Sequence, residues 1–508
     1  MATTQQKLAT SLAALKKLQD EGIQVYKSSD FSRTDKERLL KSGYILQMMR
    51  GWYVSSSPTL RAGDTTPLLS TCWEFISRYY TDKYGKNWCL APEQSLLLHA
   101  ANTTIPLNLV VYSPEGSNNT VSLPMGVTLV DMKSNKVAPD EITELDGLRV
   151  VSLPAALGYV TEAFYKSNSI DVRTALAAIK DGSELLDFFL VDGKVTRAGR
   201  VAGALRAIGN TEAADNIMTT MKAVGHDIRE SNPFDEVPLE GAALERVHPI
   251  VWRLNAMWEK MRDDVIKTFP EAPEKKKAIE QLLKDVEARY EADAYHSLSI
   301  EGYKVSTELI DRIAKGNWSP EEGGADASDK NALAASGYWK CFQEVKETIS
   351  TILSNDEINP GKQVEKDHRK WYLALFGPLV TAGVCDPRAL AGYRRDRVII
   401  SESRHAPPNY EAVPDAMAAL FTLLKNEEHP AVRIVLGHWM FGYIHPYMDG
   451  NGRMARFLMN VMLIAGGYDW LVIDVANRTE YMAALESASV DGNILPFAEF
   501  LATHQPIE

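Results

Sequence analysis

Cysteine is scarce in this chain, with four residues among 508. These four residues form no C-x-x-C pair and have no histidine at the spacing of a zinc ligand, which argues against a disulfide-stapled fold and a cysteine-based zinc site. Cysteines of this kind are expected to be reduced core residues in a reducing cytosol. They are Cys72, Cys89, Cys341 and Cys385.

Long hydrophobic runs are also missing. The longest ones, such as residues 374–384, are too short to span a bilayer and are interrupted by glycine and proline. The first residues contain no apolar segment typical of a signal peptide. We therefore expect a cytoplasmic protein that makes no contact with a membrane.

Positive charge is in deficit, because 55 Lys and Arg face 67 Asp and Glu and the formal net charge is −12. This balance argues against a protein that coats nucleic acid along its whole length. Residues 1–61 are the exception, with ten basic and five acidic side chains. Any contact with nucleic acid is therefore expected at the N-terminus.

Hydrophobic residues make up 45% of the chain and charged residues 24%, which are ordinary values for folded globular proteins. The length suggests roughly three domains. Changes in pattern along the chain place them at residues 1–62, 63–232 and 240–508. The polar, proline-containing stretch from residue 231 to 241 marks the last boundary.

Residues 1–62 have the pattern of a winged helix-turn-helix. A helix with leucines on one face precedes a basic helix at 35–41, and strands are expected at 44–48 and 52–54. In such a fold the basic helix enters the major groove of duplex DNA. The same scaffold also serves as a protein-interaction module, and a small packing module with a solvated basic helix is the plainer alternative. The basic side chains are Arg33, Lys36, Arg38 and Lys41.

Residues 63–232 are predicted to form a small α+β domain. Short β-rich runs at 107–112, 120–123, 127–132 and 148–153 are followed by helical stretches, and no catalytic set of residues is apparent. Together with the winged segment, this block resembles the regulator or antitoxin of abortive-infection toxin–antitoxin systems of the AbiEi type, over residues 5 to about 210. Residues 240–508 are expected to be mainly α-helical.

The strongest chemical signal lies in residues 445–456, between apolar helices expected at 431–443 and 454–465. Two glycines permit backbone conformations that leave N–H groups free to form an anion-binding nest at a helix start. Two arginines three residues apart can reach different phosphates, a carboxylate can hold Mg²⁺, and a histidine can accept a proton near neutral pH. The residues concerned are His445, Asp449, Gly450, Asn451, Gly452, Arg453 and Arg456.

Two other interpretations compete for this segment. The glycines can simply make a tight turn between helices, with the charged side chains in surface ion pairs, but so many functional residue types within twelve positions argue against that. A zinc hydrolase using His438, His445 and Asp449 is the second interpretation. It lacks an H-E-x-x-H pair and leaves the glycines unexplained.

At these residues the chain closely resembles the Fic family, whose motif is H-x-F-x-[D/E]-G-N-G-R-x-x-R, with Tyr447 in place of phenylalanine. The resemblance extends over about residues 240–503. It implies a mainly α-helical core that transfers AMP from ATP, with Mg²⁺, to a hydroxyl of a protein target, which includes the enzyme itself. In this arrangement His445 is the base and Asp449 holds the metal. The cofactor-binding residues implied are Gly450, Asn451, Gly452, Arg453 and Arg456.

The resemblance includes two further stretches. Upstream of the motif, residues 392–408 resemble the family's flap, a β-hairpin that docks the target through Val398, Ile399 and Ile400; an ordinary edge hairpin is the plain alternative. Ser297-Leu-Ser-Ile-Glu301-Gly302 matches the family's inhibitory motif, in which Glu301 reaches Arg456 and occupies the place of the γ-phosphate. Read alone, it is a capped helix end with a solvated glutamate.

The resemblance has limits. Where relatives often place an asparagine against the adenine, this chain has Ser489, so the choice of base is open. The target, the DNA site and the oligomeric state are likewise open, and the same Glu301 can orient a water for removal of AMP. The main hypothesis is an auto-inhibited protein adenylyltransferase. The alternatives are a DNA-binding autoregulator in which the Fic fold senses nucleotide, and a transferase of another nucleotidyl or phosphoryl group.

Overall fold

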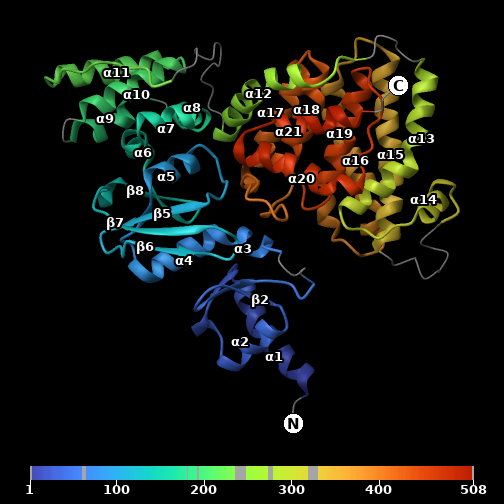
Figure 1. The fold of residues 1–508 in the computed structure, drawn as a ribbon, viewed down its shortest axis with the longest axis horizontal. Helices are drawn as coiled ribbons and strands as arrows, with labels where there is room; N and C mark the ends of the chain where they lie inside the picture. Colours follow the sequence, from blue (N-terminus) through green and yellow to red (C-terminus); the bar gives the residue numbers. More distant parts are fainter. Residues whose placement is uncertain are drawn as a thin grey trace. The chain divides into compact units, whose positions relative to one another are not determined.

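The structure is a computed structural model that describes residues 3–59, 64–179, 181–191, 194–234, 248–272, 278–318 and 330–505. The chain divides into two compact units, Met1–Pro249 with Ile399–Ala406, and Ile250–Val398 with Pro407–Glu508 (Figure 1). The boundaries expected near residues 62 and 240 lie outside the described residues. No helix in the described parts is both long enough and apolar enough to cross a membrane.

The N-terminal part of the first unit contains two helices and a three-stranded antiparallel sheet of order β1-β3-β2. Thr3 caps the first helix with a capping box, and Ser32 caps the second through a 3.1 Å bond from Asp35 N. Glycines in the left-handed region, Gly22 and Gly43, follow the two helices. The elements are α1 (Thr4–Asp20), β1 (Val25–Lys27), α2 (Arg33–Lys41), β2 (Ile45–Met49) and β3 (Trp52–Ser55).

The expected helices and the two expected strands of this part are present, and β1 is an additional strand that pairs with β3. A small core of buried apolar residues joins the helices to the sheet, and its members are Leu15, Tyr26, Phe31, Leu39, Ile45 and Tyr53. The interpretation of this part as a winged helix-turn-helix stays a prediction.

Residues 64–234 form a four-stranded sheet of order β4-β5-β7-β6, a β8-β9 hairpin and a group of helices. The expected strands are present, but the last ends at Val151, because residue 153 begins a helix with proline in its first turn. The strands are β4 (Cys89–Leu90), β5 (Asn108–Ser113), β6 (Asn119–Ser122), β7 (Thr128–Lys133), β8 (Ile142–Leu145) and β9 (Leu148–Val151). The helices are α3 (Thr66–Ser70), α4 (Cys72–Tyr84), α5 (Pro92–His99), α6 (Leu153–Tyr159), α7 (Glu162–Ser167), α8 (Ser169–Ala177), α9 (Ser183–Leu190), α10 (Val195–Ala207) and α11 (Thr211–Ala223).

The second unit is mainly α-helical, as expected. Helix α19 is buried along almost its whole length, and α15, α16 and α18 pack against it (Figure 1). The helices are α12 (Pro249–Thr268), α13 (Ile279–Ile300), α14 (Thr307–Ala314), α15 (Lys330–Ser354), α16 (Pro360–Thr381), α17 (Val413–Asn426), α18 (Pro430–Ile444), α19 (Asn451–Ala465), α20 (Arg478–Glu486) and α21 (Leu495–Thr503).

Helix α13 ends where its sequence predicts. Glu301 is the C-cap residue, and Gly302 follows in the left-handed region with a φ of 86°. The N–H of Tyr303 then returns to the carbonyl of Leu298 at 3.0 Å, a bond that closes the helix end. As a result, the side chain of Glu301 leaves α13 at its very end.

The β-hairpin expected for the flap was wrong, since Val398, Ile399 and Ile400 lie in no strand. The backbone turns at Glu402, whose φ is 59°, and the groups beyond the turn bond elsewhere. The carbonyl of Arg404 accepts from Ile105 N at 3.0 Å, and that of Ala406 accepts from Thr103 Oγ1 at 2.5 Å. Residues 399–406 thus belong to the first unit, and carbonyls that a second strand would use are already paired.

Candidate active site

The candidate site lies at the turn that joins α18 to α19. His445 ends α18 in the left-handed conformation, with a φ of 53°, and Gly450 precedes α19 with a φ of 82°. A Cβ on Gly450 would lie 2.5 Å from the ring of Phe376, so both the conformation and the close approach require glycine. Helix α19 begins at Asn451, one turn before the expected start. Its first N–H groups therefore border the turn.

The side chain of Asn451 holds this turn together. Its Oδ1 accepts from Tyr447 N at 2.9 Å and its Nδ2 donates to Tyr447 O at 2.8 Å. The ring of Tyr447 is buried and stacks on Tyr372, with centroids 3.7 Å apart. Tyr447 therefore fills an apolar slot, and the carboxamide expected at a phosphate is engaged mainly within the loop.

The imidazole of His445 is half-buried and has one nitrogen fixed. Its Nδ1 lies 3.1 Å from the carbonyl of Gly442, so Nδ1 carries the proton that it donates there and Nε2 is the basic nitrogen. Burial and the charge of Arg394 lower the pKa of His445 to about 4, against the opposite effects of the Gly442 bond, Glu301 and Asp449. His445 is consequently neutral near pH 7, the state that a general base needs.

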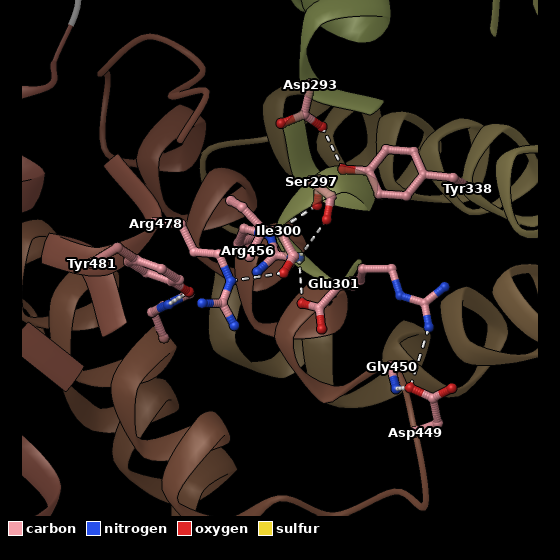
Figure 2. Close-up of polar contacts among 12 residues, drawn as sticks. Asp293, Ser297, Ile300, Glu301, Tyr338, Asp449, Gly450, Arg456, Arg478 and Tyr481 are labelled. Atoms are coloured by element: carbon pink, nitrogen blue, oxygen red, sulfur yellow. Dashed lines mark hydrogen bonds and ion pairs between the residues drawn. The ribbon is translucent and has the colours of Figure 1, made fainter. Parts of the chain in front are cut away.

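Arg456 is bound by the end of α13 (Figure 2). Its Nε donates to Ser297 Oγ at 2.8 Å, and its Nη2 donates to Ser297 O at 3.1 Å and to Glu301 Oε1 at 2.7 Å. Only 4% of the Arg456 side chain and 30% of the Glu301 side chain are exposed. Burial would raise the pKa of Glu301, but Arg456 and Arg453 outweigh it and hold the pKa below its usual value. The expected contact between Glu301 and Arg456 is therefore present, as an ionised pair.

Arg453 is fully buried but not fully paired. Its guanidinium lies between the rings of Tyr303 and Phe376, 5.1 Å from each centroid, and its Nη2 is 3.5 Å from Asp449 Oδ1. Its Nε and Nη1 have no hydrogen-bond partner in the described part of the chain. Because unpaired buried N–H groups of a cation are costly, this arrangement favours an anionic ligand.

Asp449 is the one candidate metal ligand in the turn. Its Oδ1 accepts from Gly450 N at 2.5 Å, and 57% of its side chain is exposed. Mg²⁺ commonly uses one or two carboxylates and completes its shell with water and phosphate oxygens, so Asp449 fits Mg²⁺ in company with a polyphosphate.

The zinc interpretation finds no support in the geometry. His438 is buried, and its Nε2 lies 2.9 Å from Tyr481 Oη. Within the described residues, no group of three His, Cys, Asp or Glu side chains is placed to hold a metal ion. The donor set that a zinc hydrolase requires is absent there.

Other predicted residues lie outside this cluster. Ser489 accepts from Trp439 Nε1 at 3.0 Å, within a π-helical turn over Ser487–Asp491. In the first unit, Arg33 pairs with Glu37 at 3.0 Å and Arg38 with Asp35 at 3.5 Å, while Lys36 lies over the ring of Tyr53 and Lys41 is exposed. Internal ion pairs thus engage two of the four basic side chains that are expected to contact DNA. DNA binding by residues 1–62 stays a prediction.

The structure also brings in residues whose roles the sequence did not reveal. Tyr303 covers Arg453. Arg478 Nε donates to the carbonyl of Ile300 at 3.0 Å, which fixes the last turn of α13 (Figure 2). Tyr338 supports the same helix one turn earlier through a 2.6 Å bond to Asp293. The position of Tyr303 directly after Gly302 was the one available signal, while the other contacts join distant segments.

The segment that carries this turn is also similar to known proteins. Residues 366–463 match the Fic/DOC family. This segment of the chain is therefore similar to a Fic domain. Relatives named protein adenylyltransferase Fic include those of Nematostella vectensis, 28% identical over 277 residues, and Drosophila mojavensis, 34% identical over 124 residues. The aligned parts cover 54% and 24% of this chain and 59% and 24% of those proteins. The chain thus spans less than two thirds of the length of these relatives.

Two solved structures are also similar. Residues 134–508 of Fic-1 from Caenorhabditis elegans are 17% identical, with 69% of this chain and 88% of that chain covered and a TM-score of 0.37. A Fic domain-containing signaling protein from Bacteroides thetaiotaomicron is also 17% identical, with 50% and 92% covered and a TM-score of 0.34.

Proposed function

We propose that this protein is an auto-inhibited adenylyltransferase that transfers AMP from ATP to a hydroxyl of a protein, its own chain included. The observation that carries the proposal is that the same turn holds a neutral histidine base and leads into a helix start with a buried, partly unpaired arginine. The names of the relatives support the same activity.

The chemistry follows from the free nitrogen of His445. Its Nε2 accepts the proton of the target hydroxyl, and the hydroxyl oxygen then bonds to the α-phosphorus of ATP. The bond from that phosphorus to the oxygen that bridges to the β-phosphate breaks, and pyrophosphate leaves with the electron pair. A fixed Nδ1–H bond to Gly442 keeps Nε2 as the acceptor throughout.

The arginines and the start of α19 supply the binding of the polyphosphate. Arg453 offers the unpaired N–H groups of its Nε and Nη1 to the β-phosphate, and Arg456 would meet the γ-phosphate once Glu301 has moved. The first N–H groups of α19 and its dipole favour anions at the same point. A Mg²⁺ ion held by Asp449 and phosphate oxygens would add further charge neutralisation.

The end of α13 occupies both arginines, which supports auto-inhibition. Glu301 takes the N–H group of Arg456 that a γ-phosphate oxygen would use, and Tyr303 lies over the face of Arg453. A Cβ on Gly452 would lie 2.3 Å from Glu301 Oε1, so the carboxylate sits directly on the first turn of α19. ATP and the carboxylate therefore compete for the same place.

The direct test is to incubate the wild-type protein and the Glu301→Gly variant with labelled ATP, CTP, GTP and UTP. Covalent label from ATP in the variant, located by mass spectrometry, is the expected result. Release of AMP from the labelled product by the wild-type protein would reveal the reverse activity. The proposal fails if no nucleotide labels either protein or any added protein extract.

The pH dependence of the transfer is expected to be flat near neutrality. Neutral His445 is the reactive form, and its pKa of about 4 lies far below neutral pH. The Glu301→Gly variant loses a carboxylate that raises this pKa. The acidic limb of its rate profile, where the rate falls because His445 becomes protonated, therefore lies at a still lower pH. Initial rates should thus be constant between about pH 6 and pH 8. A decrease of the rate below about pH 6.5, caused by protonation of His445 in the variant, would contradict this prediction.

Tyr303→Ala should increase the affinity for ATP, because it uncovers the guanidinium of Arg453. A cation–π contact is worth about 0.5 to 2 kcal/mol, which corresponds to roughly a 2- to 30-fold change in the dissociation constant. Calorimetric titration with ATP measures it, and Tyr303→Phe, which keeps the ring, is the matched control. Equal affinities of the two variants would show that the ring does not compete with ATP.

A further inference from the structure

Arg394 is buried beside the candidate site and has an unusual set of partners. Its side chain is 4% exposed, and no carboxylate of the described residues pairs with it. Its Nε donates to the carbonyl of His445 at 2.9 Å, its Nη1 to the carbonyl of Asp396 at 3.1 Å, and its Nη2 to that of Pro408. Its backbone N–H donates to the carbonyl of Pro446 at 2.9 Å. One residue thus binds the two peptide units that follow α18.

The cost of this arrangement argues for a specific role. A buried guanidinium without an anion is expensive, and burial lowers the pKa of Arg394 to about 10. The carbonyls that it binds belong to three segments, which are the turn after α18, the loop of Arg394 itself and the stretch before α17. A rigid planar fork suits this task better than a lysine, whose ammonium is a single point.

The hydrogen bonds from Arg394 lie next to a residue with an unfavourable backbone conformation. His445 adopts the left-handed conformation, which residues with a Cβ rarely adopt. This conformation determines where the imidazole leaves the chain. Within the described residues, the ring itself makes a single hydrogen bond, from Nδ1 to the carbonyl of Gly442. Bonds to the carbonyls of His445 and Pro446 fix the peptide units on the far side of that residue.

We propose that Arg394 is a positioning residue: its guanidinium and backbone N–H hold the His445–Pro446 backbone so that the imidazole remains aimed at the acceptor hydroxyl. The inference rests on the proposed function for the identity of the reaction. It assigns to this segment a role in the geometry of the base, separate from any docking of the target. The charge of Arg394 has a second effect, because it acts on the ionisation of His445 together with Glu301 and Asp449.

The test compares Arg394→Lys and Arg394→Met in the full-length Glu301→Gly protein. Misplacement of a catalytic group by about 1 Å costs on the order of 10²-fold in rate, so both variants should lose roughly 10- to 100-fold in kcat. The dissociation constant of ATP should change less than about two-fold, because Arg394 has no role at the phosphates. Arg395→Met, which removes an exposed positive charge from the neighbouring position, is the matched control and should leave kcat unchanged.

The two substitutions separate geometry from charge. Lysine keeps the positive charge, so the acidic limb of the rate profile should stay in place while kcat falls. Methionine removes a charge that lowers the pKa of His445, so the same limb should move to higher pH as well. If kcat falls in both variants and their pH profiles are the same, the result supports the positioning role of Arg394 and excludes an effect of its charge on His445.

A second measurement needs no activity. The ring of His445 is titrated by NMR in wild-type protein and in both variants with labelled histidine, and the His445→Gln spectrum assigns its signal. The Arg394 variants should change the chemical shift of this ring, while the Arg395→Met protein should not. If the Glu301→Gly protein transfers no AMP, the proposed function fails, and this titration still tests the contact between Arg394 and His445.

Three results would overturn the inference. The first is an unchanged kcat and an unchanged His445 signal in both variants. The second is an equal loss in the Arg395→Met control. The third is loss of the folded state in both variants, measured by thermal unfolding, because it would make Arg394 a general stabilising residue.

Discussion

Replacing Glu301 by glycine should raise AMP transfer by roughly 10- to 100-fold. The carboxylate accepts a 2.7 Å charged hydrogen bond from Arg456, and hydrogen bonds to charged groups are worth about 1.5 to 3 kcal/mol. Removing the carboxylate takes away the anion that competes with the γ-phosphate for that guanidinium, while the bonds to Ser297 remain. Mass spectrometry of the adduct reports the rate, and calorimetric titration with ATP reports the affinity.

The physical cause can be isolated with three further variants. Glu301→Gln keeps the shape of the side chain but not its charge, so it should give an intermediate increase. Arg456→Ala in the Glu301→Gly background should lower the rate again, because the γ-phosphate then loses its partner. Glu308→Gln, which changes an exposed carboxylate on the neighbouring helix α14, is the charge-matched control and should have no effect.

The result also decides between two interpretations of the end of α13. A Glu301→Gly protein that transfers AMP at the same low rate as the wild type, with the same affinity for ATP, would mean that residues 297–302 are only a capped helix end. An increase in affinity without an increase in rate would mean that Glu301 controls binding while another feature limits the transfer.

The sequence predicted the turn of the site because its residues have local requirements. Gly450 has a left-handed backbone conformation and lies against Phe376. Gly302, which follows the end of α13, also has a left-handed backbone conformation. Both positions are visible in the sequence as glycines at helix ends. The contact between Glu301 and Arg456 came from the family resemblance, since residues 155 positions apart leave no local signal.

The remaining features depend on pairing between distant segments. The flap hairpin was wrong because the carbonyls of Arg404 and Ala406 bond to residues 105 and 103. Nothing in the sequence indicated that the carboxamide of Asn451 closes the turn on Tyr447, and the contact of Asn451 with a phosphate stays a prediction. A single sequence reports which side chains can donate or accept, but the choice of partner is made by tertiary packing.

His445→Ala should reduce AMP transfer by about 10² to 10⁴-fold, the usual contribution of a general base. The expected loss is confined to proton transfer, because among the described residues the imidazole makes one hydrogen bond, to the carbonyl of Gly442, and none to Arg453 or Arg456. Affinity for ATP and the unfolding temperature should therefore stay close to those of the parent Glu301→Gly protein.

His438→Ala is the contrasting variant: it removes a buried ring that bonds to Tyr481, so it should lower stability as well as activity. Rates at several pH values, with ATP affinity measured alongside, distinguish the two. Undiminished transfer in the His445→Ala protein would exclude this imidazole as the base and leave charge neutralisation by Arg453 and Arg456 as the main source of catalysis.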